Sequence, residues 1–302
     1  MSKITLELPD GKKAEYIHAY GITYNSATVK NHFPDGDLKS HIEDIRRLEI
    51  RDDDIYLATY PKCGTHWVWE ILVMLKRGNA VYETKVKEAA FLDFRSPDQV
   101  KNIPSPRVLN CHYPCKLAPK GIFKKEIKIV HVMRNPKDAF VSFYHHHKHF
   151  NSGSFISFGD YLPQMIGEYG IYQFYPWFQY VKEWERFTKA HPEQILNLFY
   201  EDLKEDPVRE IKKINSFLGT DRSDDLILDI AKACDFHNLK KADAEVKVKE
   251  SFMKDDGRPS PMYRKGQVGD WKNHFTVAQN EKVDEWLADN LIDTDLKFRY
   301  TL

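Results

Sequence analysis

A lysine, a glycine and a threonine lie close together where an apolar run meets a helix-like segment. The segment is Thr59-Tyr60-Pro61-Lys62-Cys63-Gly64-Thr65-His66-Trp67. The first N–H groups of a helix lack intrahelical acceptors and the helix dipole is positive there, so such a turn attracts anions. Lys62 adds a charge, Gly64 permits close backbone approach, and Thr65 adds a hydroxyl donor. The pattern predicts an anion site, although an ordinary strand–helix turn with a solvent-facing lysine also fits.

A second positive group occupies a comparable position further along the chain. Arg134 follows an apolar run; Asn135 can cap the next helix, Pro136 suits its first position and Asp138 its first turn. Arginine binds phosphate in bidentate fashion. Ser142 lies about two turns into that helix. The segment therefore predicts a phosphate contact, with a surface arginine and a packing serine as the alternative.

Two further segments give weaker indications of a functional site. MYRKGQVGDWK, residues 262–272, is a basic loop. His112 directly follows the apolar run 107–111, and an imidazole titrates near neutral pH, as a general base requires. With 13 histidines in the chain, a structural role for His112 remains equally open from the residues alone.

The elements that must position these residues are alternating strands and helices. Apolar, β-rich runs occur at 55–60, 107–111, 128–133 and 194–200, with helix-like stretches at 66–76, 136–147 and 175–189. Such alternation predicts a single α/β domain over 1–302, with a central parallel β-sheet flanked by helices. Ligands bind beyond the carboxyl ends of such strands, where Lys62, His112 and Arg134 fall. The polar segment 241–260 is predicted to be a long surface loop.

Composition excludes several other classes. The 302 residues carry 45 Lys+Arg and 45 Asp+Glu, which argues against a broad nucleic-acid-binding surface. The most apolar stretch, 67–75, is too short to span a bilayer and contains Glu70. The N-terminal run lacks the apolar core of a signal peptide, so a cytoplasmic location with no membrane association is expected. A P-loop kinase is disfavoured, because Lys62 precedes the glycine whereas a Walker A lysine follows it.

Four motifs together resemble the cytosolic sulfotransferase family. TYPKCGTHWVWEIL resembles the family's TYPKSGTTWxxEI, RNPKDAFVSFYH its RNxKDxxVSxYH, MYRKGQVGDWK its FxRKGxxGDWK, and LNCHYP its KTHLP. The resemblance implies transfer of a sulfuryl group from 3′-phosphoadenosine 5′-phosphosulfate (PAPS), with adenosine 3′,5′-bisphosphate (PAP) as product. It implies a P-loop-like loop that cradles the 5′-phosphosulfate. The implied nucleotide contacts are Lys62, Cys63, Gly64, Thr65, His66, Trp67, Arg134, Ser142, Tyr200, Cys234, Phe236, Met262, Tyr263, Arg264, Lys265 and Gly266.

The resemblance also assigns catalytic roles. It implies that His112 is the base, that Lys62 contacts the bridging oxygen, and that Ser142 interacts with Lys62. The family commonly has lysine where this chain has Asn110, two residues before the histidine, so one positive charge is missing. His66 and Lys148 are the candidates to replace it. Cys63, His66 and Cys234 also depart from the family's usual Ser, Thr and Thr. Asn110, Cys63 and Cys234 motivate a non-catalytic nucleotide-binding protein as the alternative.

The remaining expectations concern the acceptor, metals and assembly. Phe91 and Phe94, in a segment resembling the family's FLEF, together with His112, His146 and Phe178, are predicted to contact a small acceptor of apolar or aromatic character. No metal is predicted: His145 and His149 have helical i,i+4 spacing but lack a convincing third ligand, and Cys111, His112 and Cys115 are too few for a structural zinc. The segment from Lys272 through Thr276 and Val277 to Glu281 resembles the family's KxxxTVxxxE dimer segment and predicts a homodimer.

Overall fold

The four apolar runs form one parallel sheet in the computed structural model, which describes residues 1–7, 11, 13–33, 37–150, 156–247 and 262–302. The strands are β4 (Ile55–Thr59), β5 (Val108–Cys111), β6 (Lys128–Met133) and β7 (Ile195–Phe199). Their order is β5-β4-β6-β7, and every neighbouring pair is parallel. The predicted α/β class is thus confirmed, with the predicted strand ends accurate to one residue.

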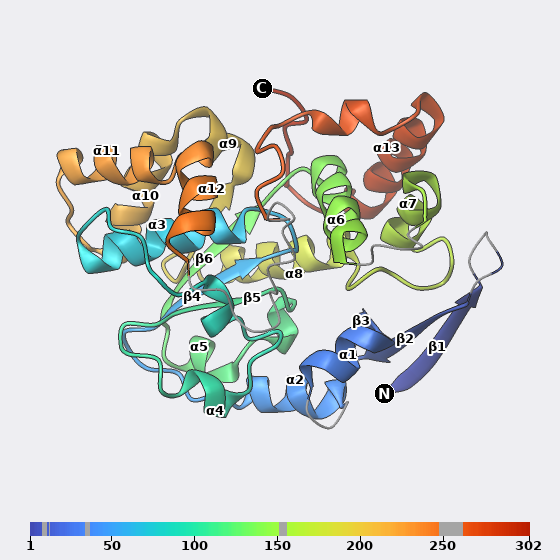
Figure 1. Ribbon diagram of the computed structural model, residues 1–302, viewed down its shortest axis with the longest axis horizontal. Helices are drawn as coiled ribbons and strands as arrows, with labels where there is room; N and C mark the ends of the chain where they lie inside the picture. Colours follow the sequence, from blue (N-terminus) through green and yellow to red (C-terminus); the bar gives the residue numbers. More distant parts are fainter. Residues whose placement is uncertain (8–10, 12, 34–36, 151–155, 248–261) are drawn as a thin grey trace.

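Helices cover both faces of this sheet because alternate strand residues point to opposite sides. Ile55 and Leu57 pack with helices α3 (Thr65–Arg77), α10 (Pro207–Leu218), α11 (Asp224–Ala233) and α12 (Phe236–Glu245). Tyr56 and Ala58 pack with α2 (Leu38–Arg46), α6 (Pro136–Phe150), α7 (Phe158–Ile166) and α8 (Trp177–Ala190). Figure 1 shows α3, α10, α11 and α12 gathered on one flank. The remaining helical segments are α1 (Ser26–His32), α4 (Pro97–Val100), α5 (Lys120–Lys124), α9 (Tyr200–Glu205), α13 (Val277–Leu291), and the 3-10 turns η1 (Lys87–Ala90), η2 (Cys115–Leu117) and η3 (Asp270–Asn273).

The strand order places a crevice between β4 and β6. After β4 the chain crosses toward β5, whereas after β6 it crosses the other way, toward β7. Connections that diverge in this way leave a gap above the carboxyl ends of the two strands. The segment with Lys62 follows β4 and Arg134 follows β6, so the two predicted anion contacts flank the gap.

An N-terminal antiparallel sheet was not predicted. It comprises β1 (Ser2–Glu7), β2 (Lys13–Ala19) and β3 (Ile22–Asn25). Tyr20 and Gly21 have φ values of 54° and 87°, as a tight hairpin turn between β2 and β3 requires. The Thr23 N–H donates to the Phe174 carbonyl at 2.7 Å, which ties β3 to the main domain.

The predicted loop over 241–260 is wrong at its start. Residues 241–245 are the last turn of α12, which begins where the Asp235 carboxylate accepts the His237 N–H, and which buries Leu239 and Ala242 on one face. These apolar positions are three apart, the spacing of a helix face, and the many lysines around them obscured that signal. Residues 248–260 lie outside the described residues.

Candidate active site

A cavity of about 1320 Å³ lies above the carboxyl ends of β4, β5 and β6. It brings together residues that are up to about two hundred positions apart in sequence. Those predicted from the sequence that line it are Lys62, Gly64, Thr65, His66, Trp67, Phe91, Phe94, His112, Arg134, Ser142, His146, Tyr200, Cys234, Phe236, Met262, Tyr263, Arg264, Lys265 and Gly266.

The turn between β4 and α3 has the backbone of an anion-binding turn. Lys62 has a φ of 70°, and Gly64, which precedes the first helical residue, has a φ of 99°. A Cβ on Gly64 would lie 3.0 Å from the Tyr200 ring, so glycine is needed for both its conformation and its small size. Since intrahelical bonding begins with the Val68 N–H donating to Gly64, the N–H groups of residues 65–67 have no acceptor within the helix.

Cys63 does not line the cavity as predicted. Its side chain is fully buried in the core, with Sγ 3.9 Å from the Pro61 carbonyl, and its N–H donates to the Tyr60 carbonyl at 3.2 Å. Burial raises the pKa of the thiol to about 12. A small, apolar-compatible thiol suits this inward position, so the change from serine alters packing rather than the lining of the cavity.

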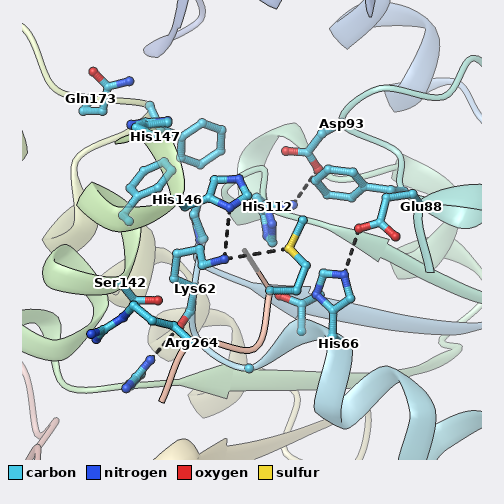
Figure 2. A pocket seen from close by; sticks show the side chains of 18 of the residues that line it. Lys62, His66, Glu88, Asp93, His112, Ser142, His146, His147, Gln173 and Arg264 are labelled. Carbon is cyan, nitrogen blue, oxygen red and sulfur yellow. Dashed lines mark hydrogen bonds and ion pairs between the residues drawn. The ribbon is translucent and has the colours of Figure 1, made fainter. Parts of the chain in front are cut away.

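Lys62 points into the centre of the cavity (Figure 2). Its Nζ donates to Nδ1 of His146 at 3.2 Å and lies 3.9 Å from the Met262 sulfur. Burial, with Lys87 and Arg134 nearby, lowers the pKa of Lys62 to about 7. An anion bound here would reverse that shift, because negative charge favours the ammonium. Ser142 lines the same cavity, and its predicted interaction with Lys62 remains a prediction for the nucleotide-bound protein.

Arg134 connects the three predicted nucleotide-binding segments. Its guanidinium donates to the backbone carbonyls of Lys62 and Gln267, each at 3.1 Å, and stacks 4.1 Å above the Tyr200 ring. The buried Nε atoms of Arg134 and Arg264 have no hydrogen-bond partner among the described residues. Unused buried donors of positive charge beside a helix start fit a polyanionic ligand, so these residues suit a nucleotide that carries phosphates at both ends.

Aromatic rings enclose one end of the cavity. Trp67 meets Tyr200 edge-to-face with ring centroids 5.5 Å apart, and the buried Trp67 indole N–H has no partner among the described side chains and backbone. Phe236, the first residue of α12, contacts Tyr263 and packs against Gly266, where any Cβ would come within 2.3 Å of the Phe236 ring. Such surfaces accommodate a flat base.

The basic segment 262–272 is anchored by carboxylates. Asp138, in the first turn of α6, accepts the N–H groups of Gly269 and Trp271 at 2.8 and 2.9 Å. Asp270 accepts from Arg264 and Lys265, each at 2.6 Å, which fixes both cations beside the cavity. The Asn135 side chain accepts the Asp138 N–H at 2.9 Å, as the helix cap predicted there requires.

His112 is held in one tautomer. Its Nδ1 lies 2.8 Å from the Thr59 carbonyl and 3.0 Å from the Thr59 hydroxyl. A carbonyl only accepts, so Nδ1 carries the hydrogen and Nε2 keeps its lone pair. The His112 N–H donates to Asp93 at 2.8 Å, which fixes the backbone. Burial, followed by the charge of Lys87, lowers the pKa of His112 well below 6.5, so the imidazole is neutral at pH 7.

Aromatic side chains pack around His112. The Phe91 ring contacts the His112 ring at a centroid distance of 4.9 Å, and it also contacts the Phe94 ring at a centroid distance of 5.3 Å. Tyr24 and Phe174, both unpredicted, complete this wall; Tyr24 lies 5.6 Å from each of Phe94 and Phe174. Tyr24 comes from β3, a part of the chain without a recognisable motif, and only its alternating strand pattern could have indicated it.

Phe178 lies outside the cavity, although it was predicted to contact the acceptor. Near the start of α8, its ring contacts Tyr172 and Trp286 at 6.2 and 5.7 Å, and it is not among the described residues that line the cavity. The ring faces α13, so it packs between helices.

Three of the four histidines of α6, His145, His146 and His147, contact different partners. His146 contacts Lys62, the His147 ring lies 2.8 Å from the Tyr161 hydroxyl, and His145 meets His274 edge-to-face. Within the described part of the chain, no three His, Cys, Asp or Glu side chains are arranged to hold a metal. A search of the same residues for a helix long and apolar enough to cross a membrane finds none.

Neither candidate supplies the missing positive charge. His66 lies 2.9 Å from Glu88, and burial lowers its pKa, so it is neutral at pH 7 (Figure 2). Lys148 lies over the Tyr144 ring at 5.8 Å and is not one of the described cavity-lining residues. The cation that does approach Asn110 is Lys87, whose Nζ is 3.3 Å from the Asn110 Oδ1. No sequence motif marked it.

Comparisons with known proteins agree on one family. A family model described as "Sulfotransferase domain" matches residues 52–295. The rat protein sulfotransferase 1A1 is 36% identical over 266 residues, 83% of this chain and 88% of that one. Human sulfotransferase 1E1 is 35% identical over 279 residues, 87% and 92% of the two chains. The crystal structure of mouse sulfotransferase SULT7A1 complexed with PAP is similar with a TM-score of 0.74 and 27% identity, covering 93% of this chain and 96% of that one.

Proposed function

The chain belongs to the sulfotransferase family and is a PAPS-dependent sulfotransferase, and from this premise we propose that His112 is the general base that activates a small acceptor. The observation that carries the proposal is the bond from Nδ1 of His112 to the Thr59 carbonyl at 2.8 Å. This bond leaves Nε2 as the basic atom in a residue that lines the cavity. The acceptor group is a hydroxyl or an amine, since either supplies both a nucleophile and a proton.

The other predicted site residues stabilise the leaving group and bind the nucleotide. PAPS supplies the sulfuryl group and a phosphate leaving group. His112 Nε2 takes the acceptor proton, and the Lys62 ammonium neutralises charge that develops on the leaving phosphate. Arg134 and Ser142 hold the 3′-phosphate. Arg264, Lys265 and Gly266 close over it, and Trp67, Tyr200 and Phe236 enclose the base. The turn at 60–66 receives the 5′-phosphosulfate at the helix start.

The aromatic side chains around His112 support an acceptor molecule of aromatic or apolar character. Phe91, Phe94, Tyr24 and Phe174 are within ring-contact distance of one another or of His112. Rings of this kind stack on aromatic compounds and exclude water from the transfer point.

Incubation with ³⁵S-labelled PAPS and a panel of phenols, alcohols, steroids and amines tests the proposal. We expect label transfer to at least one aromatic or steroidal acceptor and little to small hydrophilic alcohols. Tight binding of PAP without transfer to any acceptor would favour the non-catalytic alternative. Phosphate transfer from ATP would revive the kinase interpretation.

The proposal includes a homodimer through the segment of Lys272, Thr276, Val277 and Glu281. Thr276 caps α13 with Gln279, and the adjoining Val277 is 75% exposed, so its side chain is available to a small interface. We expect Val277→Glu to shift sedimentation from dimer to monomer. The control is Ile292→Glu, at an apolar position that is 86% exposed and directly follows α13. A wild-type monomer at high concentration would contradict the dimer.

A cytoplasmic location stays a proposal, supported by the family resemblance.

A further inference from the structure

Transfer of a sulfuryl group needs positive charge beside its non-bridging oxygens. Lys62 directs its Nζ to His146 in the cavity, and its backbone carbonyl accepts from Arg134. On the side of β5, Asn110 is neutral, and neither His66 nor Lys148 supplies a charge there, for the reasons given above. In a buried site, a preorganised cation at this point would be worth far more than in water.

Lys87 is buried on that side. Its side chain is 4% exposed, lines the cavity, and places Nζ 4.0 Å above the Phe91 ring, which in turn contacts the His112 ring. Asn110 fixes this arrangement at both ends. Its Oδ1 accepts from Lys87 Nζ at 3.3 Å, and its amide donates to the carbonyls of Lys87 and Ala90 at 3.0 and 3.1 Å.

Lys87 is paired with the Glu88 carboxylate, which it shares with His66. The Oε1 atom of Glu88 lies 3.1 Å from Lys87 Nζ and 2.9 Å from His66 Nε2. Although burial alone raises the pKa of Glu88, Lys87 and His66 hold it well below its usual range, so the carboxylate is ionised. After burial, Lys87 is the largest cause that lowers the pKa of both Lys62 and His112. The charge of Lys87 therefore acts on both Lys62 and His112.

We propose that Lys87 is a catalytic residue whose ammonium contacts the non-bridging oxygens of the transferring sulfuryl group, opposite Lys62; this rests on the proposed function. The sulfur–oxygen bond to the acceptor forms while the bond to phosphate breaks, its electron pair leaves on the phosphate oxygen, and the acceptor proton moves to His112. Lys87 neither gains nor loses a proton. Its charge stabilises the oxygens throughout.

The test compares PAPS with PAP, because the two ligands differ by the sulfuryl group. In Lys87→Met, without acceptor, we expect the Kd of PAPS to rise about tenfold, as for a lost hydrogen bond to a charged group, while the Kd of PAP stays near that of the wild type. kcat should fall roughly 10²-fold, and Lys87→Arg should retain much of both. The control is Lys137→Met, which removes a buried lysine paired with one carboxylate outside the cavity and should leave the ratio of the two Kd values unchanged.

A second-site variant separates charge from structure. Lys87→Met with Asn110→Lys returns one ammonium to the same point and should recover turnover, whereas Asn110→Lys alone should not raise the rate, because two ammonium groups would then be in contact. In Lys87→Met, NMR titration of His112 should show a higher imidazole pKa. Unchanged ratios of PAPS to PAP affinity together with a kcat like that of the wild type would overturn the role of Lys87. A wild-type protein that transfers no label would instead overturn the proposed function, and the affinity ratio would still test Lys87.

Discussion

Replacing His112 by asparagine should lower kcat by about 10²- to 10⁴-fold, the usual contribution of a general base, while PAP binds nearly as tightly as to the wild type. The asparagine amide can still donate to the Thr59 carbonyl, as Nδ1 of His112 does at 2.8 Å. The variant thus removes Nε2 and keeps the bond that orients the side chain. Single-turnover transfer of label and calorimetric titration with PAP measure the two effects separately.

A structural role for His112 makes a different prediction. His131 is also buried, contacts Asn197 at 3.0 Å, and is not among the described cavity-lining residues. His131→Asn should lower thermal stability with little change in kcat per folded molecule. If His112→Asn behaves in the same way, with near-normal turnover, His112 is not the base.

The pH profiles of the wild type give an independent check. Since the pKa of His112 lies well below 6.5, kcat should be constant around neutral pH and fall only as pH drops through that lowered pKa. kcat/KM for PAPS reports the free enzyme, in which the pKa of Lys62 is about 7, so it should decline as pH rises through about 7. kcat should not decline there, because the bound anion restores the proton on Lys62. A decline in kcat at the same pH would contradict this assignment.

The parallel sheet and its ligand edge could be predicted because local signals suffice for them. A parallel strand buried on both faces is a short apolar run, and its end is marked by the next polar or glycine residue. Lys62, His112 and Arg134 each occur at such an end, so the topology alone brings them together. The helix cap at Asn135 is equally local, since it depends on a residue and the N–H three positions on.

The acceptor side of the cavity could not be predicted, because it is built by long-range packing. Tyr24 reaches Phe94 and Phe174 from a separate sheet, and no spacing in the sequence indicates that contact. Lys87 was missed for a related reason. A lysine in a charged segment normally faces solvent, and only the fold shows that this one is buried against Asn110.

The direction of the Phe178 side chain was also ambiguous from the sequence. Phe178 occupies the second position of α8, and whether such a ring points to the cavity or to a neighbouring helix depends on where α13 packs. Cys63 is the converse case. The turn at 60–66 directs the Cys63 side chain into the core, and a positive φ at Lys62, which the sequence does not reveal, is part of that turn.

Arg134→Ala should weaken PAP binding roughly 10²-fold and raise the apparent KM for PAPS by a similar factor, while the affinity for 5′-AMP changes little. An arginine with an unused, buried Nε–H offers a phosphate a full charge and charge-assisted bonds, each worth about 1.5–3 kcal/mol. PAP and 5′-AMP differ only in the 3′-phosphate. A selective loss for PAP, measured by calorimetry, would therefore locate that phosphate at Arg134.

The comparison is needed because Arg134 also supports the site. It donates to the carbonyls of Lys62 and Gln267, so its loss also loosens two segments that line the cavity. Loosening weakens PAP and 5′-AMP alike, whereas loss of the phosphate contact weakens PAP alone; an equal loss for both ligands would break the 3′-phosphate assignment. Arg222→Ala is the matched control, because Arg222 likewise donates to two backbone carbonyls, those of Leu75 and Lys76, at the opposite end of α3. It should cost stability without changing the ratio of the two affinities, since no described contact joins Arg222 to the cavity.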